Sequence, residues 1–352
     1  MFRLWRMSGA LSLLAGMMAV SPCQATLFQG DLYYTHFTGG GPNVLKVGFT
    51  YNDVSKSLAY GGQIGVATVN GADGIMFAPN GNLLVTSNTV GSVYRINPAN
   101  GAVLQTIATS GSTDFHMALD PSGTKFYSSD RYTRFSGPLD TFVINPNGTV
   151  NNATATAIVG IDPNVTQLAF APNGKVFYTD GTPNANGSIG LFTLGNPNST
   201  TQLIGPNQVV AAHGIIYDPF TGLMTMFGGG QVATIDPNAG NNTQITNSLK
   251  QFDVPNIGDF DQGSVDGFGH AFIAGSGAIT FIDYSQSGDI TNPNNTIIIT
   301  GGFGNIDDVA PLVGLGAPPN AVPEPGSLTM LGIGALGALG FTWRRRRATP
   351  PA

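Results

Sequence analysis

Apolar and polar residues alternate over short runs along the body of the chain, and clusters of glycine, proline and asparagine separate these runs. Almost no run repeats its apolar residues at the spacing of a helix. Alternation is typical of strands buried on one face, and glycine and proline favour tight turns. The pattern therefore predicts an all-β body, and the 49 glycines and 23 prolines of the chain suit its many turns.

One unit of this pattern recurs six times. An apolar strand turns at a corner that resembles Pro-x-Gly, and a second strand begins just after a glycine. These second strands are expected at residues 30–36, 81–87, 123–129, 174–180, 222–228 and 269–275, a spacing of 42 to 51 residues. A further turn follows in most units, at residues 97–101, 145–148, 236–240 and, in a looser form, 51–55. Each unit is therefore interpreted as a four-stranded antiparallel meander.

Six such units predict a six-bladed β-propeller over residues 26–315. The first unit begins at its second strand, whereas Ile306–Val313 predicts an extra first strand at the other end of the body. One blade is therefore expected to combine both ends, which closes the ring and removes open sheet edges.

The corners at residues 77–81 and 170–174 share the sequence Phe-Ala-Pro-Asn-Gly. Through these corners the body resembles the NHL and gluconolactonase-like superfamily of six-bladed propellers. The resemblance implies the fold of residues 27–315. It implies little about chemistry, because propellers include enzymes, glycan binders and protein scaffolds.

The first 25 residues predict a signal peptide. Arg3 and Arg6 precede an apolar stretch over residues 10–20, and Cys23-Gln24-Ala25 ends in a small residue before a plausible cleavage site. Eleven apolar or small residues are too few to span a bilayer core of roughly 30 Å. Cleavage after Ala25 would remove Cys23, the sole cysteine. The alternative is a lipoprotein acylated at Cys23, although Pro22 is a poor fit to that signal.

The C-terminal residues combine three features in a fixed order. Residues 316–321 form a linker, Pro323-Glu324-Pro325 precede an apolar run over residues 328–343, and four arginines follow before the tail at 348–352. Sixteen apolar residues at about 1.5 Å each predict a thin transmembrane helix, with the arginines retained on the cytoplasmic side. The sorting residues are Pro323, Glu324, Pro325, Arg344, Arg345, Arg346 and Arg347.

Residues 322–347 resemble the PEP-CTERM sorting domain, whose members are recognised and processed by an exosortase. This resemblance implies Sec-dependent export and a Gram-negative host that makes extracellular polysaccharide or biofilm. Such tails are also catalogued as an ice-binding protein C-terminal domain, a label that is not evidence of ice binding. The alternative is an ordinary C-terminal anchor. The expected location is the cell envelope, the cell surface or the extracellular matrix, with transient or retained inner-membrane anchoring by residues 328–343.

The charge of the body excludes some partners. Six of the 14 basic residues belong to the two ends, and Glu324 is the sole glutamate among the 20 acidic residues. The body thus holds 8 basic residues against 19 aspartates, a net charge near −11. This charge disfavours nucleic acid and anionic membrane surfaces as partners, whereas it suits divalent cations or neutral glycans.

Polar residues are expected to gather at one mouth of the central channel. In a propeller, the first strand of each blade begins on the face where the second strand ends. Aligned corners place Asp73, His213, Asp261 and Asp307 at one mouth position, beside Phe115 and Thr166. His116 and Asp308 lie one residue later, and His270 lies on the opposite face. The candidate ligands for a divalent cation are His36, Asp73, His116, Asp180, His213, Asp261 and Asp307. The alternative is a solvated mouth with no ligand.

Three functional hypotheses follow. Gluconolactonase-like and virginiamycin B lyase-like propellers use a glutamate in their active sites, and this body has none. The sequence also lacks the Gly-x-Ser-x-Gly, phosphate-loop and His-Glu-x-x-His motifs of other catalytic mechanisms. We therefore favour a non-enzymatic propeller that binds polysaccharide or envelope proteins. The alternative is a metal-dependent lactonase or lyase at the channel mouth. A purely structural scaffold is a third possibility.

Overall fold

The computed structural model describes residues 27–37, 41–110, 114–129, 139–156, 165–181, 187–193, 196–275 and 277–310. The expected signal peptide, linker, sorting segment, transmembrane helix and tail all lie outside these residues. Within them, no helix is long and apolar enough to cross a membrane. Among the described residues, those within 31–48 and 61–310 belong to a larger compact unit, and residues 27–30 and 49–60 belong to a smaller one.

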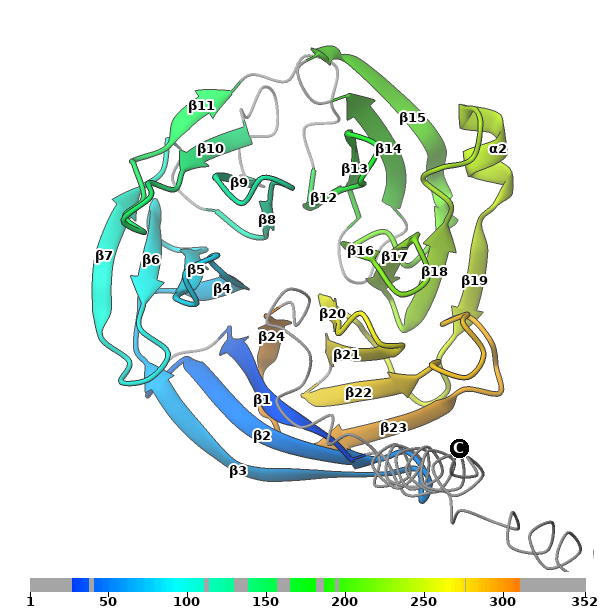
Figure 1. Cartoon of the computed structure of the whole chain (residues 1–352), viewed down its shortest axis with the longest axis horizontal. Helices are drawn as coiled ribbons and strands as arrows, with labels where there is room; N and C mark the ends of the chain where they lie inside the picture. The colour runs from blue at the N-terminus through cyan, green and yellow to red at the C-terminus, as the bar shows by residue number, and fades with distance from the viewer. Residues whose placement is uncertain are drawn as a thin grey trace, which may run out of the picture. The chain divides into compact units, whose positions relative to one another are not determined.

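The larger unit confirms the predicted six-bladed propeller, in which four-stranded antiparallel sheets surround a common centre (Figure 1). Five blades follow chain order. They are β4 (Ala72–Phe77), β5 (Leu83–Ser87), β6 (Ser92–Ile96), β7 (Val103–Ala108); β8 (Met117–Leu119), β9 (Lys125–Ser128), β10 (Leu139–Val143), β11 (Thr154–Thr156); β12 (Gln167–Phe170), β13 (Lys175–Thr179), β14 (Gly187–Thr193), β15 (Asn196–Val209); β16 (Gly214–Asp218), β17 (Leu223–Gly228), β18 (Gln231–Ile235), β19 (Lys250–Asp253); and β20 (Gly263–Val265), β21 (His270–Gly275), β22 (Ala278–Asp283), β23 (Thr296–Gly301).

The remaining blade closes the ring as predicted. Its strand order is β24 (Ile306–Val309), β1 (Leu27–His36), β2 (Val44–Asn52) and β3 (Ser57–Ala67). Tyr34 pairs with Val309 and His36 with Ile306, and the register shifts between these two pairs. The C-terminal strand thus lies innermost in a blade whose other strands come from the N-terminal part of the body.

The Pro-Asn-Gly corners form as their sequence predicts. Gly81 and Gly174 both have a φ of 81°, a left-handed conformation that favours glycine. Their N–H groups donate to the carbonyls of Ala78 at 2.9 Å and Ala171 at 3.0 Å. These turns reverse the chain between the first and second strands of two blades.

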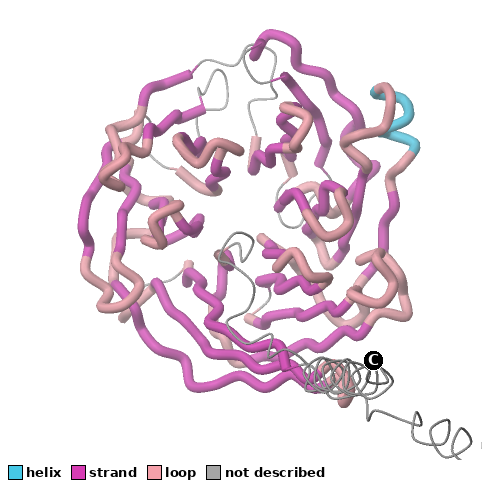
Figure 2. Tube along the Cα trace, in the orientation of Figure 1, coloured by secondary structure: helices cyan, strands magenta, loops and turns pink. Residues whose placement is uncertain are grey.

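One turn differs from the expectation of a plain strand reversal. A six-residue helix, α2 (Asn242–Asn247), lies between β18 and β19 and is visible in cyan in Figure 2. Asn241 caps it by accepting a hydrogen bond from the N–H of Gln244 at 3.0 Å. Ile245 is fully buried. An Asn cap with one buried apolar residue is enough for a single packed turn, but it is too short to show a helical period in the sequence.

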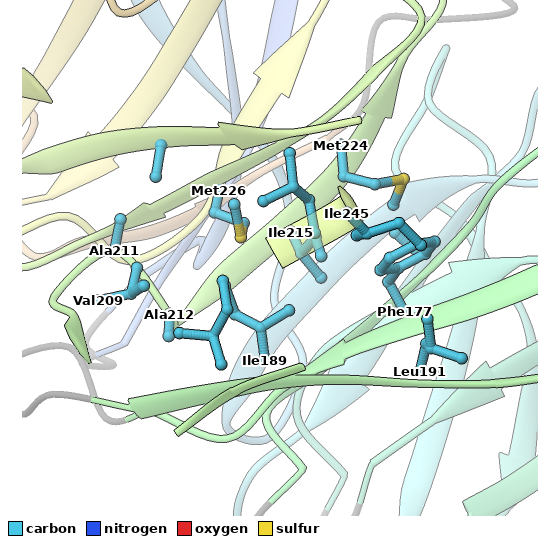
Figure 3. Close-up of a cluster of buried hydrophobic side chains, with 14 of the residues drawn as sticks. Phe177, Ile189, Leu191, Val209, Ala211, Ala212, Ile215, Met224, Met226 and Ile245 are labelled. Atoms are coloured by element: carbon cyan, nitrogen blue, oxygen red, sulfur yellow. The ribbon is translucent and has the colours of Figure 1, made fainter. Parts of the chain in front are cut away.

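The core lies between neighbouring blades. Phe177 and Ile189 on one blade pack against Ile215, Met224 and Met226 on the next, and all five side chains are buried (Figure 3). Burying a side chain of this size stabilises the fold by about 1.5–3 kcal/mol. Contacts of this kind fix the spacing of the inner strands, and therefore the positions of side chains at the channel mouth.

The described part of the smaller unit holds the loose turn expected at residues 51–55. The side chain of Asn52 accepts hydrogen bonds from the N–H groups of Val54 at 3.0 Å and Ser55 at 2.9 Å. Lys56 follows with a φ of 51°. Phe28 and Phe49 pack with their ring centroids 5.0 Å apart.

Candidate functional site

A repeated hydrogen bond positions the residues at the channel mouth. In four blades, a hydroxyl near the end of the second strand donates to a backbone carbonyl at the mouth position of the next blade. The pairs are Thr35 to Asp73 at 2.6 Å, Thr86 to Phe115, Ser129 to Thr166 at 2.7 Å, and Thr179 to His213 at 2.5 Å. These buried hydrogen bonds hold successive blades in register, so the mouth positions lie at corresponding places in each blade.

His213 is oriented by the preceding blade. Its Nδ1 atom lies 2.8 Å from the carbonyl oxygen of Gly181, and its Nε2 atom contacts Oδ1 of Asp261 in the following blade. A carbonyl only accepts, so Nδ1 carries the proton. Nε2 therefore faces the Asp261 carboxylate either as a lone pair or as the second N–H of an imidazolium.

His116, two blades earlier, is held in a similar way. Its Nδ1 atom lies 3.2 Å from the carbonyl oxygen of Thr166. Its Nε2 atom lies 3.4 Å from Oδ1 of Asp308 and 3.7 Å from Oδ1 of Asp261. The rings of His116 and His213 meet edge to face with centroids 5.1 Å apart. Both imidazoles thus direct Nε2 toward Asp261.

The close approach of neighbouring inner strands at the mouth requires glycine at two positions. A Cβ atom on Gly74 would overlap the carbonyl oxygen of Phe115 and lie 3.0 Å from Cα of His116. A Cβ on Gly214 would lie 3.0 Å from the carbonyl oxygen of Asp261. Side chains at these positions would push neighbouring blades apart, so both glycines allow the inner strands to converge.

Three further carboxylates surround the imidazoles. Asp73 accepts from Asn88 at 2.8 Å, and Asp308, which is fully buried, lies beside His116. With its amide nitrogen facing Asp308, Gln262 donates to the two carboxylate oxygens at 2.9 and 3.2 Å. Asp307 is 8 % exposed, and its buried Oδ2 atom has no hydrogen-bond partner. The site therefore concentrates negative charge on one side of two histidines.

The electrostatics follow from burial and mutual contact. Burial, then the charge of Asp308, raises the pKa of Asp73 to about 7. Burial opposes protonation of His116, but Asp308, Asp261 and Asp73 outweigh it and raise the pKa of His116 to about 10. Burial also opposes ionisation of Asp261, yet the charge and hydrogen bond of His213 lower the pKa of Asp261. Without a metal, the cluster therefore holds a proton on His116 and a carboxylate at Asp261.

The structure brings together five of the seven residues proposed from the sequence. His116, His213 and Asp261 offer ligand atoms within 4.8 Å of one another, as do Asp73, His116 and Asp308, and Asp261, Asp307 and Asp308. His36 and Asp180 lie outside these groups. Asp180 instead accepts hydrogen bonds from the N–H and hydroxyl of Ser188.

Sequence reasoning missed Asp308 as a candidate, although the pair Asp307-Asp308 was a visible signal. The aligned corners also placed Gln262 beside the mouth, whereas Asn88 had no such signal, because an asparagine in a repeat is usually a turn residue. His270, which begins β21, does not join the site. Its Nδ1 atom lies 2.7 Å from Oδ2 of Asp266.

Comparison with known proteins adds two findings. Residues 321–347 match the family model of the PEP-CTERM protein-sorting motif, one residue longer than the segment expected from the sequence. No curated protein matches the chain. The motif implies an exported protein that an exosortase sorts to the cell envelope or surface.

Two solved structures share the propeller fold at low identity. A chain of a nidogen/laminin complex is 11 % identical, with a TM-score of 0.56, over 80 % of this chain and 97 % of that one. The periplasmic gluconolactonase of Pseudomonas aeruginosa is 13 % identical, with a TM-score of 0.50, over 81 % of this chain and 98 % of that one. At such identities the likeness shows the fold alone. The chain therefore combines a PEP-CTERM sorting motif with a six-bladed β-propeller that resembles gluconolactonase-like and NHL-like propellers.

Proposed function

We propose that this exported propeller binds a divalent cation of the zinc type at the channel mouth, through His116 Nε2, His213 Nε2 and Asp261 Oδ1. The observation that carries the proposal is the orientation of the two imidazoles. Each donates its Nδ1 proton to a backbone carbonyl, which leaves Nε2 directed at a carboxylate. A lone pair that faces an anion needs a positive charge between them, which is either a proton or a metal ion.

The chemistry of these donors fits such an ion. Metal-bound histidines commonly donate the other ring nitrogen to a carbonyl or carboxylate, which fixes the ring. Two imidazoles and one carboxylate form a ligand set used by catalytic zinc sites, which keep a fourth position open. Oδ1 of Asp261 is the carboxylate oxygen that faces Nε2 of both imidazoles. The acidic body further favours a cation as the bound species.

The burial of the cluster limits what can reach it. The side chain of Asp261 is 21 % exposed, whereas His116 and His213 are 4 % and 2 % exposed. A small molecule with a carbonyl or hydroxyl oxygen can approach the cation from the side of Asp261 more readily than a polymer chain can. A bound cation would polarise that oxygen. The same site therefore suits a small oxygen-containing ligand.

Hydrolysis of an ester or lactone is a second candidate function. The observation that favours it is Asp307, a buried carboxyl that lies in the same group as Asp261. In this position Asp307 can take a proton from an attacking water. The absence of glutamate, which weakened an enzymatic hypothesis, matters less if aspartate and histidine supply the ligands. Turnover of small lactones that is lost in Asp307→Asn would support this function, and equal turnover in that variant would exclude it.

Export delivers this site outside the cytoplasm. In our proposal, the Sec machinery exports the chain, residues 328–343 anchor it in the inner membrane for a time, and an exosortase processes the tail. Binding of extracellular polysaccharide or an envelope protein stays a prediction. Glycan-array and matrix pull-down experiments with the exported protein test it, and failure in both would exclude such partners.

Calorimetric titration of chelator-treated full-length protein with Zn²⁺ tests the cation site. We expect saturable binding in the wild type that His213→Ala and Asp261→Asn each weaken by about 10- to 100-fold or more. His36→Ala is the matched control, because His36 is a propeller histidine outside the cluster, and it should bind Zn²⁺ as the wild type does. Equal affinity in all four proteins would overturn the proposal.

A further inference from the structure

A largely apolar cavity of about 370 Å³ lies along the inner strands of four blades. The inner strands β4, β8, β12 and β16 begin near the mouth and end at the corners. The cavity is lined by the residues at their corner ends, Phe77, Leu119, Phe170 and Tyr217, and by the corner prolines Pro121 and Pro172. None of the residues of the ionic cluster lines the cavity, so the two are distinct sites.

A pair of amides separates the cavity from the carboxylates. Gln167 lines the cavity, and its Oε1 atom accepts from the N–H of Ile215 at 2.6 Å. Its Nε2 atom donates to Gln262, which in turn donates to Asp308. The polar atoms of Gln167 are thus engaged by the protein. Gln167 therefore has no free hydrogen-bonding group to offer a ligand, and the two amides separate the cavity from the carboxylate of Asp308.

The lining defines the chemistry of the occupant. No charged side chain is among the residues that line the cavity, and the buried part of the wall includes Met76, Met117 and Leu168. A charged group placed there would lose its hydration without a partner. The volume lies within the range of about 300–1,000 Å³ that is typical of small-molecule sites. It is too small for a folded segment of another protein.

We propose that this cavity binds a neutral, apolar small molecule, such as a two-ring aromatic compound or a medium-length alkyl chain. Burial of such a ligand against methionine, leucine and aromatic side chains supplies the driving force. Tyr217 lines the corner end of the cavity and carries the one hydroxyl among the lining side chains. A ligand with a single polar group at that end suits the cavity best.

The test is a fluorescence titration of the exported full-length protein with N-phenyl-1-naphthylamine, a neutral two-ring probe. Saturable binding with enhanced emission is expected. Leu119 is partly exposed, so Leu119→Trp fills the opening and Leu119→Glu charges it without disturbing a fully buried position. Each should weaken probe binding by about 10-fold or more, equivalent to ~1.4 kcal/mol. Val103→Trp on the outer strand β7, where Val103 is 45 % exposed, is the matched control and should bind normally.

Chelator separates this proposal from the cation site. Probe binding should be the same with and without EDTA, because the amide pair isolates the two compartments. The proposal is overturned if the wild type shows no saturable binding, if both Leu119 variants bind as Val103→Trp does, or if EDTA abolishes binding. Loss of Zn²⁺ binding together with retained probe binding would refute the cation site and support the apolar site.

Discussion

Nε2 of His213 lies against Oδ1 of Asp261, while Nδ1 of the same ring lies 2.8 Å from the carbonyl oxygen of Gly181. Gly181 follows β13, His213 precedes β16 and Asp261 precedes β20, so one side chain connects three successive blades. The residue that we propose as a metal ligand is therefore also a structural link. Its position depends on blade packing, and blade packing depends in part on its contacts.

The first prediction concerns this link without metal. In the presence of chelator, His213→Ala should lower the free energy of unfolding by about 1–3 kcal/mol, because Asp261 loses its main partner and the carbonyl of Gly181 loses a donor. Urea unfolding measures the effect, with His36→Ala as the control. An unchanged unfolding free energy in His213→Ala would show that these contacts contribute nothing to the fold.

The second prediction concerns the hydroxyls that join the blades. Thr179→Val keeps the shape of the side chain but leaves the buried carbonyl of His213 without its hydrogen bond. The free energy of unfolding should fall by about 1–3 kcal/mol. Thr106→Val on the exposed outer strand β7 makes the same chemical change and should have an effect near zero. Equal effects of the two substitutions in urea unfolding would contradict a specific role for the mouth hydroxyls.

The third prediction is a pH dependence at Asp218, which ends β16 and accepts a hydrogen bond from the hydroxyl of Tyr284 at 3.0 Å. Burial, then Asp266, raises the pKa of Asp218 above its ordinary value of 3.8, despite hydrogen bonds from Thr221, Phe220 and Tyr284. A raised folded pKa stabilises the protein below the unfolded value, and this contribution is lost as pH rises through the folded pKa.

The comparison of wild type with Asp218→Asn isolates this group. The unfolding free energy of the wild type minus that of the variant should fall as pH rises from below 3.8 through the raised pKa, and then level off. Urea unfolding at a series of pH values measures this difference. A difference that grows with pH across this interval would have the wrong sign for a buried carboxyl.

The fourth prediction concerns the sorting tail. Mass spectrometry of the mature protein from the surface fraction should find a C-terminus that lacks Arg344–Arg347, because the PEP-CTERM motif implies processing by an exosortase. Replacing Pro323-Glu324-Pro325 with three alanines should retain the unprocessed chain at the inner membrane. Intact Arg344–Arg347 in the surface fraction would contradict processing.

The repeats made the blades predictable. A strand, a glycine corner and a second strand occur in fixed order, so six copies indicated six blades, and Ile306 to Val309 closed the ring as expected. The helix at residues 242–247 was not predictable, because its stability comes from a cap and from burial of Ile245, which a periodicity does not report.

The site was less predictable than the fold. Alignment of the corners placed His213 and Asp261 at one mouth position, and their side chains are in contact, because equivalent repeat positions lie at equivalent places in space. It failed to anticipate local partners. The register of β1 shifts against β24 next to His36, and Ser188 near the start of β14 donates hydrogen bonds to Asp180. Departures of this kind occur in single blades, so a repeat pattern carries no information about them.

The fifth prediction tests the central claim directly. Elemental analysis of full-length protein, purified without chelators, should find about one divalent cation per chain in the wild type and in His36→Ala. The double variant His116→Ala/His213→Ala should contain none while it keeps the wild-type circular dichroism. A wild-type protein that contains no divalent cation, and that binds neither Zn²⁺, Mn²⁺ nor Ca²⁺ in calorimetry, would contradict a metal centre at the channel mouth.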